Sequence, residues 1–443
     1  MKSALPKVLH PLAGRPMIGH VLAALEAIDC ARVVAVVGPG MDDVAAVVSP
    51  VRTVVQPDQR GTADAVKAAR PMLADFAGDV LVLFGADPLI TSETLARMVA
   101  ARRAAPAPAV VVLGMRPPDP SGYGRLITDP TGALSRIVEH NDASPDERAV
   151  GLCNSGVMAI DGTRLYALLD RIGCDNAKGE YYLTDIVAVA RAQGLACAVV
   201  EGDADELHGV DERADLARAE ALMQARLRAA AMAGGVTMID SASVHLAFDT
   251  RFGRDVTIEP NVVFGPGAQV GDDVIIRAFS HIEGATIADG ARIGPFARLR
   301  PGAEIGPGAR VGNFVEIKQA TVESGAKVNH LSYVGDARVG AGANVGAGTI
   351  TCNYDGFLKA RTEIGAGAFI GSNTALVAPV TVGEGAIIGA GSVIARDVPA
   401  EALALTRAKH DCREGWAKSY RTRRQAAKDR LAKDKLKTSK DER

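Results

Sequence analysis

Residues 291–317 read ARIGPFARLRPGAEIGPGARVGNFVEI and carry one aliphatic residue at every sixth position. These aliphatics are Ile293, Leu299, Ile305, Val311 and Ile317, and the same spacing returns without exception from Ile364 to Ile394. Between the two runs, Val322, Val328, Val334, Val339 and Val345 keep the pattern with occasional steps of five. Glycine or another small residue usually follows each aliphatic.

This period predicts a β-helix. A six-residue unit is too short for a pair of helices, so it indicates one short strand plus a corner, with the aliphatic side chain pointing inward. Three such strands make one triangular coil of 18 residues. The alternative, a flexible Gly-rich linker, has no reason to place an aliphatic at every sixth position.

The 443-residue chain is long enough for more than one domain. We expect an α/β, Rossmann-like domain over residues 1–210, a linker helix within 211–235, the β-helix over 236–416 and a basic tail over 417–443. The N-terminal domain should hold a mostly parallel sheet with crossover helices. Its expected strands are Val33–Val37, Thr53–Val55, Val80–Phe84, Val110–Leu113, Val157–Ile160 and Ala196–Val200, and its expected helices are Pro16–Asp29, Thr62–Asp75, Ser92–Arg103 and Leu183–Gln193.

Charge and composition exclude several classes of protein. The net charge of -2 gives no general attraction to nucleic acid, and no apolar run reaches the ~18 residues that span a bilayer. The N-terminus lacks the apolar stretch of a secretory signal, and six scattered cysteines argue against a disulfide framework. We therefore expect a cytoplasmic protein. The tail from Lys418 carries eleven Lys or Arg against four Asp or Glu, which favours a solvated, partly disordered segment over a dedicated anion-binding arm.

Two cations break the repeat where glycine is usual. Arg300 and Lys318 stand directly after inward aliphatics, and the 18 residues between them make one full coil. Their backbones should stack about 4.8 Å apart, where two positive charges repel unless an anion lies between them. Arginine offers a planar fork and lysine a point charge, so a phosphate is the natural ligand. The alternative is a solvated pair that splays apart.

A histidine follows within one further coil. The repeat resembles the β-helix of the hexapeptide acyltransferases, which makes acetyl transfer to an amine an expected reaction. That reaction needs a group of near-neutral pKa that takes the ammonium proton, and His330 meets this requirement. A lone histidine is more often a satisfied structural residue, but nearness to Arg300 and Lys318 favours the catalytic interpretation.

Three strings carry a resemblance to a known family: Gly294–Ala303, Val311–Lys318 and Gly346–Gly356. They resemble the acetyltransferase motifs of the bacterial enzymes that combine N-acetylglucosamine-1-phosphate uridyltransferase with glucosamine-1-phosphate acetyltransferase. The resemblance implies a left-handed β-helix that forms a homotrimer and binds acetyl-CoA between subunits. It implies that His330 is the general base and that the sugar phosphate is held by Arg300, Lys318, Tyr333 and Asn344. It implies an acetyl-CoA site of Ala347, Asn353, Tyr354, Ser372, Ala390 and Arg407.

The first domain resembles the sugar nucleotidyltransferase half of that family. The segment Leu5–His10 resembles the one whose lysine meets the nucleotide phosphates, which makes Lys7 the expected contact. The resemblance further implies UTP or UDP-sugar contacts at Gln56, Gly61, Thr62, Gly124, Glu139 and Asn154, and Mg²⁺ held by Asp87 and Asp211. The domain would align a sugar phosphate with the α-phosphate of UTP while Mg²⁺ neutralises charge.

This half departs from the family in three places. The family domain opens with a strand and a Gly-rich phosphate loop whose last residue coincides with Met1, so we expect a misassigned start codon in preference to a natural truncation. The family's Gly-Asp pair reads Gly85-Ala86-Asp87, and Asp211 replaces a metal-binding Asn. In a regular strand, a shift of one residue turns a carboxylate to the opposite face, although a strand end can compensate. Two alternatives to the bifunctional enzyme are therefore an acetyltransferase with an inactive first domain and a non-catalytic assembly subunit.

Overall fold

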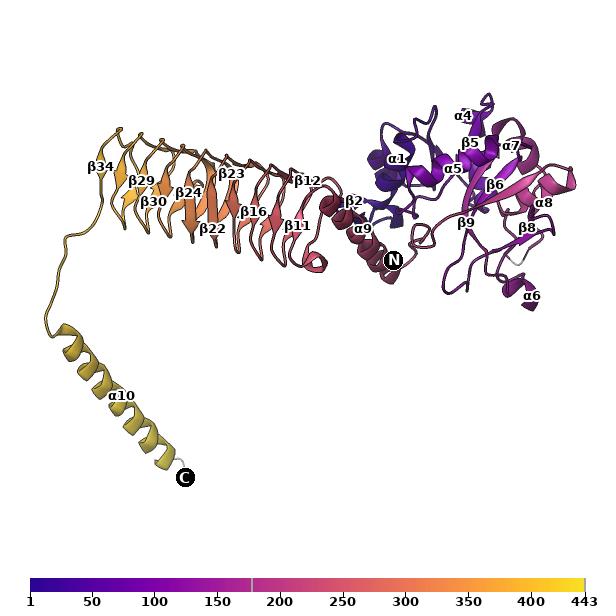
Figure 1. Ribbon diagram of the computed structural model, residues 1–443. Coiled ribbons are helices and arrows are strands. Elements are labelled where there is room, and N and C mark those ends of the chain that lie inside the picture. The colour runs from indigo at the N-terminus through magenta and orange to yellow at the C-terminus, as the bar shows by residue number, and fades with distance from the viewer. Residues whose placement is uncertain (177, 442–443) are drawn as a thin grey trace.

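The computed structural model describes residues 1–176 and 178–441, with side chains of the last helix described as far as residue 431. An α/β domain forms the N-terminal part, a long prism of short strands forms the C-terminal part, and one helix joins them (Figure 1). A search of the described residues finds no helix long and apolar enough to cross a membrane.

The N-terminal domain is built on a six-stranded sheet. Its strands are β5 (Asp79–Val82), β6 (Val110–Met115), β7 (Arg125–Thr128), β8 (Leu134–Val138), β9 (Cys153–Asp161) and β10 (Cys197–Glu201). Among these described strands only β10 and β6 pair in parallel, whereas β9 runs antiparallel to β5, β6 and β7. The prediction of a mostly parallel sheet was wrong, because an apolar run predicts a buried strand without recording its direction.

Helices and short strands surround this sheet. They are β1 (Pro11–Leu12), β2 (Arg15–Pro16), α1 (Met17–Glu26), β3 (Val34–Val37), α2 (Asp42–Val48), β4 (Arg52–Val55), α3 (Thr62–Ala68), α4 (Arg70–Leu73), α5 (Ser92–Arg103), α6 (Pro145–Arg148), α7 (Gly162–Leu169) and α8 (Asp185–Ala192). The helix expected over Thr62–Asp75 is divided into α3 and α4, because Pro71 has no N–H to donate to the preceding turn.

The predicted linker helix is present as α9 (Arg213–Ala233). It contacts both halves of the molecule through two polar side chains. Glu220 accepts a hydrogen bond from the backbone N–H of Ala13 at 2.8 Å. The buried amide of Gln224 bonds to both backbone groups of Leu246, at 2.7 and 2.8 Å. These bonds fix α9 between the α/β domain and the first coil of the β-helix.

The β-helix has three faces, which we number in the order the chain crosses them. Face 1 holds β11 (Thr237–Met238), β13 (Thr257–Ile258), β16 (Ile275–Ile276), β19 (Arg292–Ile293), β22 (Arg310–Asn313), β24 (Lys327–His330), β26 (Asn344–Val345), β29 (Phe369–Ile370), β32 (Ile387–Ile388) and β34 (Leu403–Ala404). Face 2 holds β14 (Val263–Phe264), β17 (His281–Ile282), β20 (Arg298–Leu299), β27 (Ile350–Cys352), β30 (Ala375–Val377) and β33 (Val393–Ile394). Face 3 holds β12 (Arg251–Phe252), β15 (Gln269–Val270), β18 (Ala285–Ile287), β21 (Ala303–Ile305), β28 (Thr362–Ile364) and β31 (Val380–Val382).

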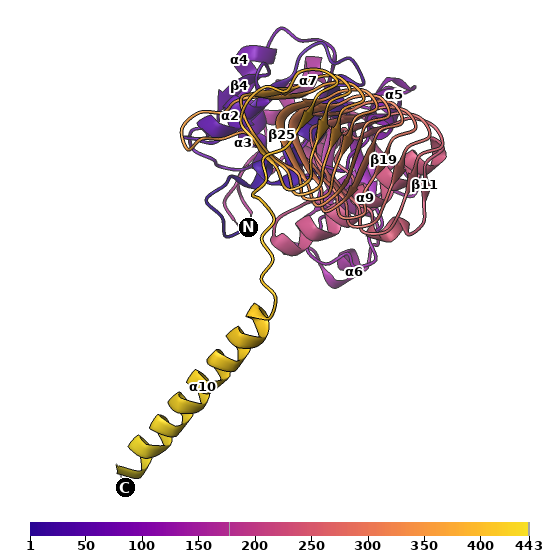
Figure 2. The same cartoon turned by 90° about the vertical axis from the view of Figure 1, so that its left-hand side faces the viewer.

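Two longer strands, β23 (Glu316–Val322) and β25 (Tyr333–Val339), run from face 2 onto face 3 without a break. Within these two strands the aliphatic spacing falls from six to five, from Ile317 to Val322 and from Val334 to Val339. The predicted inward aliphatics form one continuous core, in which Ile293, Val311 and Ile317 are at most 1% exposed. Figure 2 shows the coils stacked one behind another along the prism.

The basic tail forms helix α10 (Trp416–Asp441), which stands apart from the prism in both views (Figures 1 and 2). Its described side chains are all exposed. The expectation of a partly disordered tail gave too little weight to its composition, since Ala, Arg, Lys and Leu are good helix formers and no Gly or Pro follows Trp416.

Candidate active sites

The two repeat-breaking cations lie on adjacent coils at the corner between faces 2 and 3. The backbone N–H of Arg300 donates to the carbonyl of Ile317 at 2.9 Å, which places Arg300 beside Lys318 as the spacing predicted. The guanidinium of Arg300 also pairs with Glu316 at 2.9 Å. This carboxylate offsets part of the repulsion and orients the fork, and the repeat pattern alone did not identify it.

A third cation, Lys359, joins this corner and was missed by the sequence analysis. It lies in a loop that interrupts the repeat after β27 and is closed by a backbone bridge between Tyr354 and Lys359. Its side chain lies within hydrogen-bonding reach of Lys318, which lowers the pKa of Lys359 through that contact and through like-charge repulsion. The sequence does contain a signal that could have pointed to Lys359. The loop that carries it interrupts a strict period, and such a loop is expected to serve a function.

Polar groups surround the three cations. The hydroxyl of Tyr333 occupies the space that a Cβ on Gly335 would need, so the ring lies along face 2 toward this corner. The side-chain amide of Asn353 donates to that hydroxyl at 3.4 Å and also to Asp336. Positive charge with nearby donors suits a phosphate group. We call Arg300, Lys318, Tyr333, Asn353, Tyr354 and Lys359 the cationic corner.

His330 lies at a different corner, between faces 1 and 2. Its ring is exposed, and Nδ1 lies 2.7 Å from the side-chain oxygen of Asn313 on the adjacent coil. With that oxygen as acceptor, Nδ1 carries the proton and donates, which leaves Nε2 as a free acceptor. A neutral imidazole in this tautomer is prepared to take a proton.

A column of small residues continues this corner beyond His330. The carbonyl of Ala347 accepts from Asn373 at 2.7 Å, and the carbonyl of Ser372 accepts from Gly391 at 2.8 Å, so these positions and Ala390 lie on successive coils. A Cβ on Gly371 would collide with the backbone N of Ala390, so only glycine permits this approach. Asn344 on face 1 and Arg407 on the last turn complete what we call the histidine corner: His330, Asn344, Ala347, Ser372, Ala390 and Arg407.

The histidine corner and the cationic corner are separated by face 2. Three residues of β25, from Tyr333 to Gly335, cross that face, which at ~3.3 Å per residue amounts to about 10 Å of backbone. Within one chain, His330 and the pair Arg300 and Lys318 therefore lie at different corners of the prism, and their nearness stays a prediction. The sequence argument counted coils along the prism and neglected the position of each residue around it.

A second cluster lies in the α/β domain. The ammonium group of Lys7 pairs with the carboxylate of Asp211 at 2.7 Å, and a Cβ on Gly209 would stand 3.1 Å from a carboxylate oxygen of Asp87. Strand β5 ends at Val82, and the N–H of Asp87 donates to the carbonyl of Phe84 at 3.2 Å in a turn. Because this segment is a turn, strand alternation does not apply, and Asp87 lies toward Lys7 and Asp211 despite the shift at Ala86.

This acidic pair fits a divalent cation. Burial raises the pKa of Asp87 to about 7, the charge of Lys7 opposes that rise, and the charge of Asp211 adds to it. A cation would relieve both burial and repulsion. No group of three or more His, Cys, Asp or Glu suited to a metal occurs among the described residues. Two carboxylates suffice for Mg²⁺, which commonly takes its other oxygens from water and substrate phosphates.

The remaining predicted residues of this domain form two groups of three. Gln56 donates to the carbonyl of Gly61 at 3.0 Å, and the hydroxyl of Thr62 accepts from the N–H of Leu183 at 2.9 Å. The N–H of Asn154 donates to the carbonyl of Gly124 at 2.8 Å. A Cβ on Gly124 would stand 3.3 Å from Glu139, so these three residues form one surface. The hydroxyl of Thr62 thus has a structural contact that the sequence did not indicate.

Comparison with known proteins finds a family match in each half of the chain. A family model described as a MobA-like NTP transferase domain matches residues 1–141, and one described as a bacterial transferase hexapeptide matches 249–284, 284–319 and 361–396. Bifunctional protein GlmU of Paramagnetospirillum magneticum is 61% identical over 97% of this chain and 95% of its own length. Bifunctional protein GlmU of Rhodospirillum rubrum is 64% identical over 95% of this chain and 94% of its own length. The chain belongs to the GlmU family.

Membership of the GlmU family agrees with the architecture. An N-terminal nucleotidyltransferase domain is followed by a left-handed parallel β-helix of hexapeptide repeats, the two-part fold that the resemblance implied. The word bifunctional in the names of the GlmU relatives agrees with two separate clusters of candidate site residues in one chain.

Proposed function

We propose that this chain acetylates glucosamine-1-phosphate with acetyl-CoA and then transfers uridylyl from UTP to the N-acetylglucosamine-1-phosphate formed, giving UDP-N-acetylglucosamine. Residues 236–416 perform the first reaction and residues 1–210 the second. The observation that carries the proposal is the side-chain arrangement of His330 and Asn313, which leaves a free imidazole nitrogen beside a column of small residues. GlmU relatives that match almost the full chain support the same conclusion.

In acetyl transfer, the sugar amine attacks the thioester carbonyl of acetyl-CoA. Nε2 of His330 takes the proton that the amine loses, the carbon–sulfur bond breaks, and this proton then passes to the leaving sulfur, so that CoA departs as the thiol and the imidazole is neutral again. Asn313 holds the imidazole ring in place through Nδ1. The small residues of the histidine corner leave room for the CoA arm, and Arg407 supplies a positive charge for its phosphates.

The two corners act together only between chains. Because face 2 separates them within one chain, the histidine corner of one copy works with the cationic corner of the next. Arg300, Lys318 and Lys359 bind the sugar phosphate, while His330 of the adjoining copy reaches the amine. A ring of three copies makes three such sites, so a homotrimer is the proposed assembly.

Replacement of Arg300 or Lys318 by alanine should raise the Michaelis constant for glucosamine-1-phosphate by about tenfold or more, because each removes a charge-assisted bond to phosphate. The Michaelis constant for acetyl-CoA should change little. Steady-state titration of both substrates measures this difference. Arg254→Ala, at an exposed ion pair far from both corners, serves as the control. Equal effects on the two substrates would mean that the stacked cations serve another purpose.

In uridylyl transfer, a phosphate oxygen of N-acetylglucosamine-1-phosphate attacks the α-phosphorus of UTP and pyrophosphate leaves. Asp87 and Asp211 would hold Mg²⁺, which neutralises charge on the phosphates. Lys7 is close enough to meet the same phosphates. Gln56, Gly61 and Thr62 bind the nucleotide, and Gly124, Glu139 and Asn154 bind the sugar.

Asp87→Asn should weaken Mg²⁺-dependent UTP binding and lower pyrophosphate release, by about a hundredfold for loss of a metal ligand worth a few kcal/mol. Asp211→Asn should have the same direction with a smaller effect, since Asp211 is exposed and the family that this domain resembles has a metal-binding Asn at this position. Calorimetric titration and a pyrophosphate assay measure the two quantities. Acetyl transfer should be unchanged in both of these variants. The control variant Asp205→Asn should keep both activities. An unchanged Asp87→Asn would remove this residue from the metal site.

A further inference from the structure

Helix α10 presents an apolar strip along one side. At about 100° of rotation per residue, four side chains fall within about 60° of one another around the helix axis: Trp416, Tyr420, Ala427 and Leu431. The rings of Trp416 and Tyr420 stack with their centroids 5.0 Å apart. Trp416, Tyr420 and Leu431 are 50%, 42% and 64% exposed. A helix that only keeps a chain soluble has no need to align aromatic and aliphatic side chains in this way.

Basic side chains border this strip on both sides. The same rotation per residue places Arg423 and Arg430 along one border and Arg421, Arg424 and Lys428 along the other. All five are exposed, and the guanidinium of Arg424 lies 6.0 Å from the centroid of the Tyr420 ring. Asp429 is the one acidic residue within 416–431, and it accepts a hydrogen bond from Gln425 at 2.9 Å. Five cations beside one apolar strip indicate an anionic partner.

The far side of the helix is polar and carries no net charge within residues 416–431. It holds Lys418, Ser419, Thr422, Gln425 and Asp429, so that one cation offsets one carboxylate. Its described side-chain hydrogen bonds stay within α10, as when the hydroxyl of Thr422 donates to the carbonyl of Lys418 at 3.1 Å. Rings and cations on one side, with neutral polar groups on the other, are typical of a helix that lies on an anionic lipid surface.

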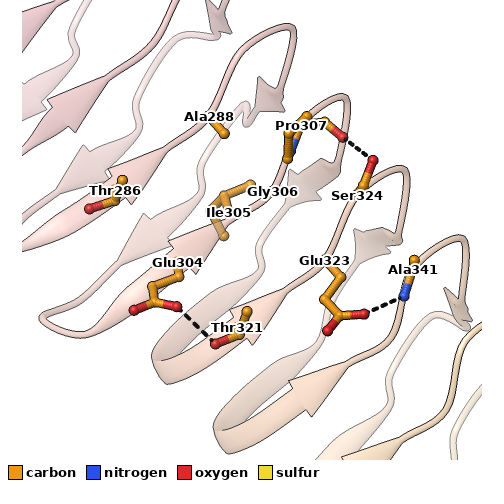
Figure 3. A pocket seen from close by; sticks show the side chains of 10 residues that line it. All are labelled: Thr286, Ala288, Glu304, Ile305, Gly306, Pro307, Thr321, Glu323, Ser324 and Ala341. Atoms are coloured by element: carbon orange, nitrogen blue, oxygen red, sulfur yellow. Dashed lines mark hydrogen bonds between the residues drawn. The ribbon is translucent and has the colours of Figure 1, made fainter.

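An acidic surface of the same chain is one alternative partner for these cations. Figure 3 shows a furrow of about 510 Å³ on the β-helix, with the carboxylates of Glu304 and Glu323 on its wall. Glu304 accepts from Thr321 at 3.1 Å, and Glu323 pairs with Arg338 at 2.7 Å. Two carboxylates that already have partners match five cations poorly, whereas an anionic leaflet offers a continuous layer of phosphate groups.

A nucleic acid is the other partner with repeated phosphates. Rings that bind unpaired bases need a free face on which a base can stack. Trp416 and Tyr420 each use one ring face on the other, and the centre of the contacting side is apolar, with its cations at the borders. At a bilayer interface, Trp and Tyr lie at headgroup level, and long basic side chains extend from an apolar strip to the phosphates. The arrangement therefore favours lipid over nucleic acid.

We propose that α10 binds the surface of a bilayer that contains anionic phospholipid. The strip of Trp416, Tyr420 and Leu431 enters the headgroup region, the bordering cations meet the lipid phosphates, and the helix lies along the bilayer without crossing it. Residues 405–415 connect α10 to β34, and a stretch of that length spans up to about 35–40 Å when extended. This connection gives α10, which stands apart from the prism, room to turn its strip toward a membrane (Figures 1 and 2).

The full chain can report on this contact without a label, because Trp416 is its single tryptophan. Vesicles of phosphatidylglycerol and phosphatidylcholine should shift the Trp416 emission to shorter wavelength, while vesicles of phosphatidylcholine alone should not. Arg424→Glu should weaken binding about twentyfold or more, because each basic residue at an anionic surface is worth about fivefold and the reversal changes two charges. Leu431→Ser, which removes apolar area and no charge, should weaken binding about tenfold.

Lys418→Glu is the matched control, since it makes the same change of charge on the far side of the helix. It should weaken binding by less than about threefold, because solvent and salt screen a charge that faces away from the lipid. Far-UV circular dichroism shows whether each variant keeps the helix content of the unsubstituted chain, and flotation of the vesicles shows how much chain is bound.

Equal binding to phosphatidylcholine alone, or equal losses in Arg424→Glu and Lys418→Glu, would overturn the proposal. Tighter binding of a single-stranded RNA than of the anionic vesicles would assign this surface to nucleic acid instead. A change of Trp416 emission in Glu304→Gln/Glu323→Gln without vesicles would place α10 on the furrow. Each of these outcomes leaves both proposed reactions untouched, since vesicle binding is measured without their substrates.

Discussion

The rate of acetyl transfer should fall by about a hundredfold or more when His330 is replaced by alanine. A positioned proton acceptor ordinarily contributes a factor of this size to the rate. The fold should survive, because His330 is exposed and is not one of the core aliphatics. Binding of CoA should survive as well, since the column of small residues is unchanged. Thiol release from acetyl-CoA in the presence of glucosamine-1-phosphate gives the rate, and calorimetric titration gives the affinity for CoA.

His281→Ala is the matched control, because His281 is another exposed histidine of the β-helix and belongs to neither corner. Asn313→Ala should reduce the rate less than His330→Ala, since it frees the ring to rotate but leaves a proton acceptor. A loss of less than tenfold in His330→Ala would remove this residue from the role of base.

Two inactive variants should restore activity when their chains are mixed. His330→Ala lacks the base, and Arg300→Ala/Lys318→Ala lacks the phosphate cations, so in the proposed homotrimer each variant alone is impaired at every site. In randomly mixed trimers about a quarter of the interfaces join an intact histidine corner to an intact cationic corner. Activity should therefore return to about a quarter of the unsubstituted level, far above either parent.

Co-expression of the two variants with different affinity tags gives the mixed trimers, and thiol release measures their activity. The same mixture prepared from separately folded homotrimers, without exchange of chains, is the control and should remain inactive. Activity of the mixed trimers no greater than that of the parents would show that each site lies within a single chain.

The sequence was most informative where physical constraints are strict. An inward aliphatic at every sixth position predicted the β-helix. The prediction is confirmed by the burial of these side chains, since those of Ile305, Val322 and Val382 are at most 2% exposed. The five-residue steps were left without an interpretation, because a strand that continues around a corner, as β23 and β25 do, cannot be recognised from the spacing alone. Lys359 lay outside the period, so no spacing rule could bring it to Lys318.

The spacing was not used to work out at which corner of the prism each residue lies, and this was the main gap in the prediction. Arg300 and His330 lie within a few coils along the axis but at different corners, and only the closed coil shows that face 2 separates them. In the α/β domain, the sequence left the side of Asp87 open between strict alternation and a strand end that compensates. The structure has the second arrangement, because β5 ends at Val82 and the turn that follows directs the carboxylate toward Lys7 and Asp211. The sheet direction was likewise a tertiary property that the apolar runs of β6 and β9 did not encode.

The most direct test of the central claim is the product formed from glucosamine-1-phosphate and acetyl-CoA by the purified chain, identified by mass spectrometry with thiol release measured in the same sample. The account predicts one molecule of N-acetylglucosamine-1-phosphate for each free CoA thiol, with both lost in His330→Ala. Thiol release without acetylation of the sugar, or acetylation that persists in His330→Ala, would contradict it.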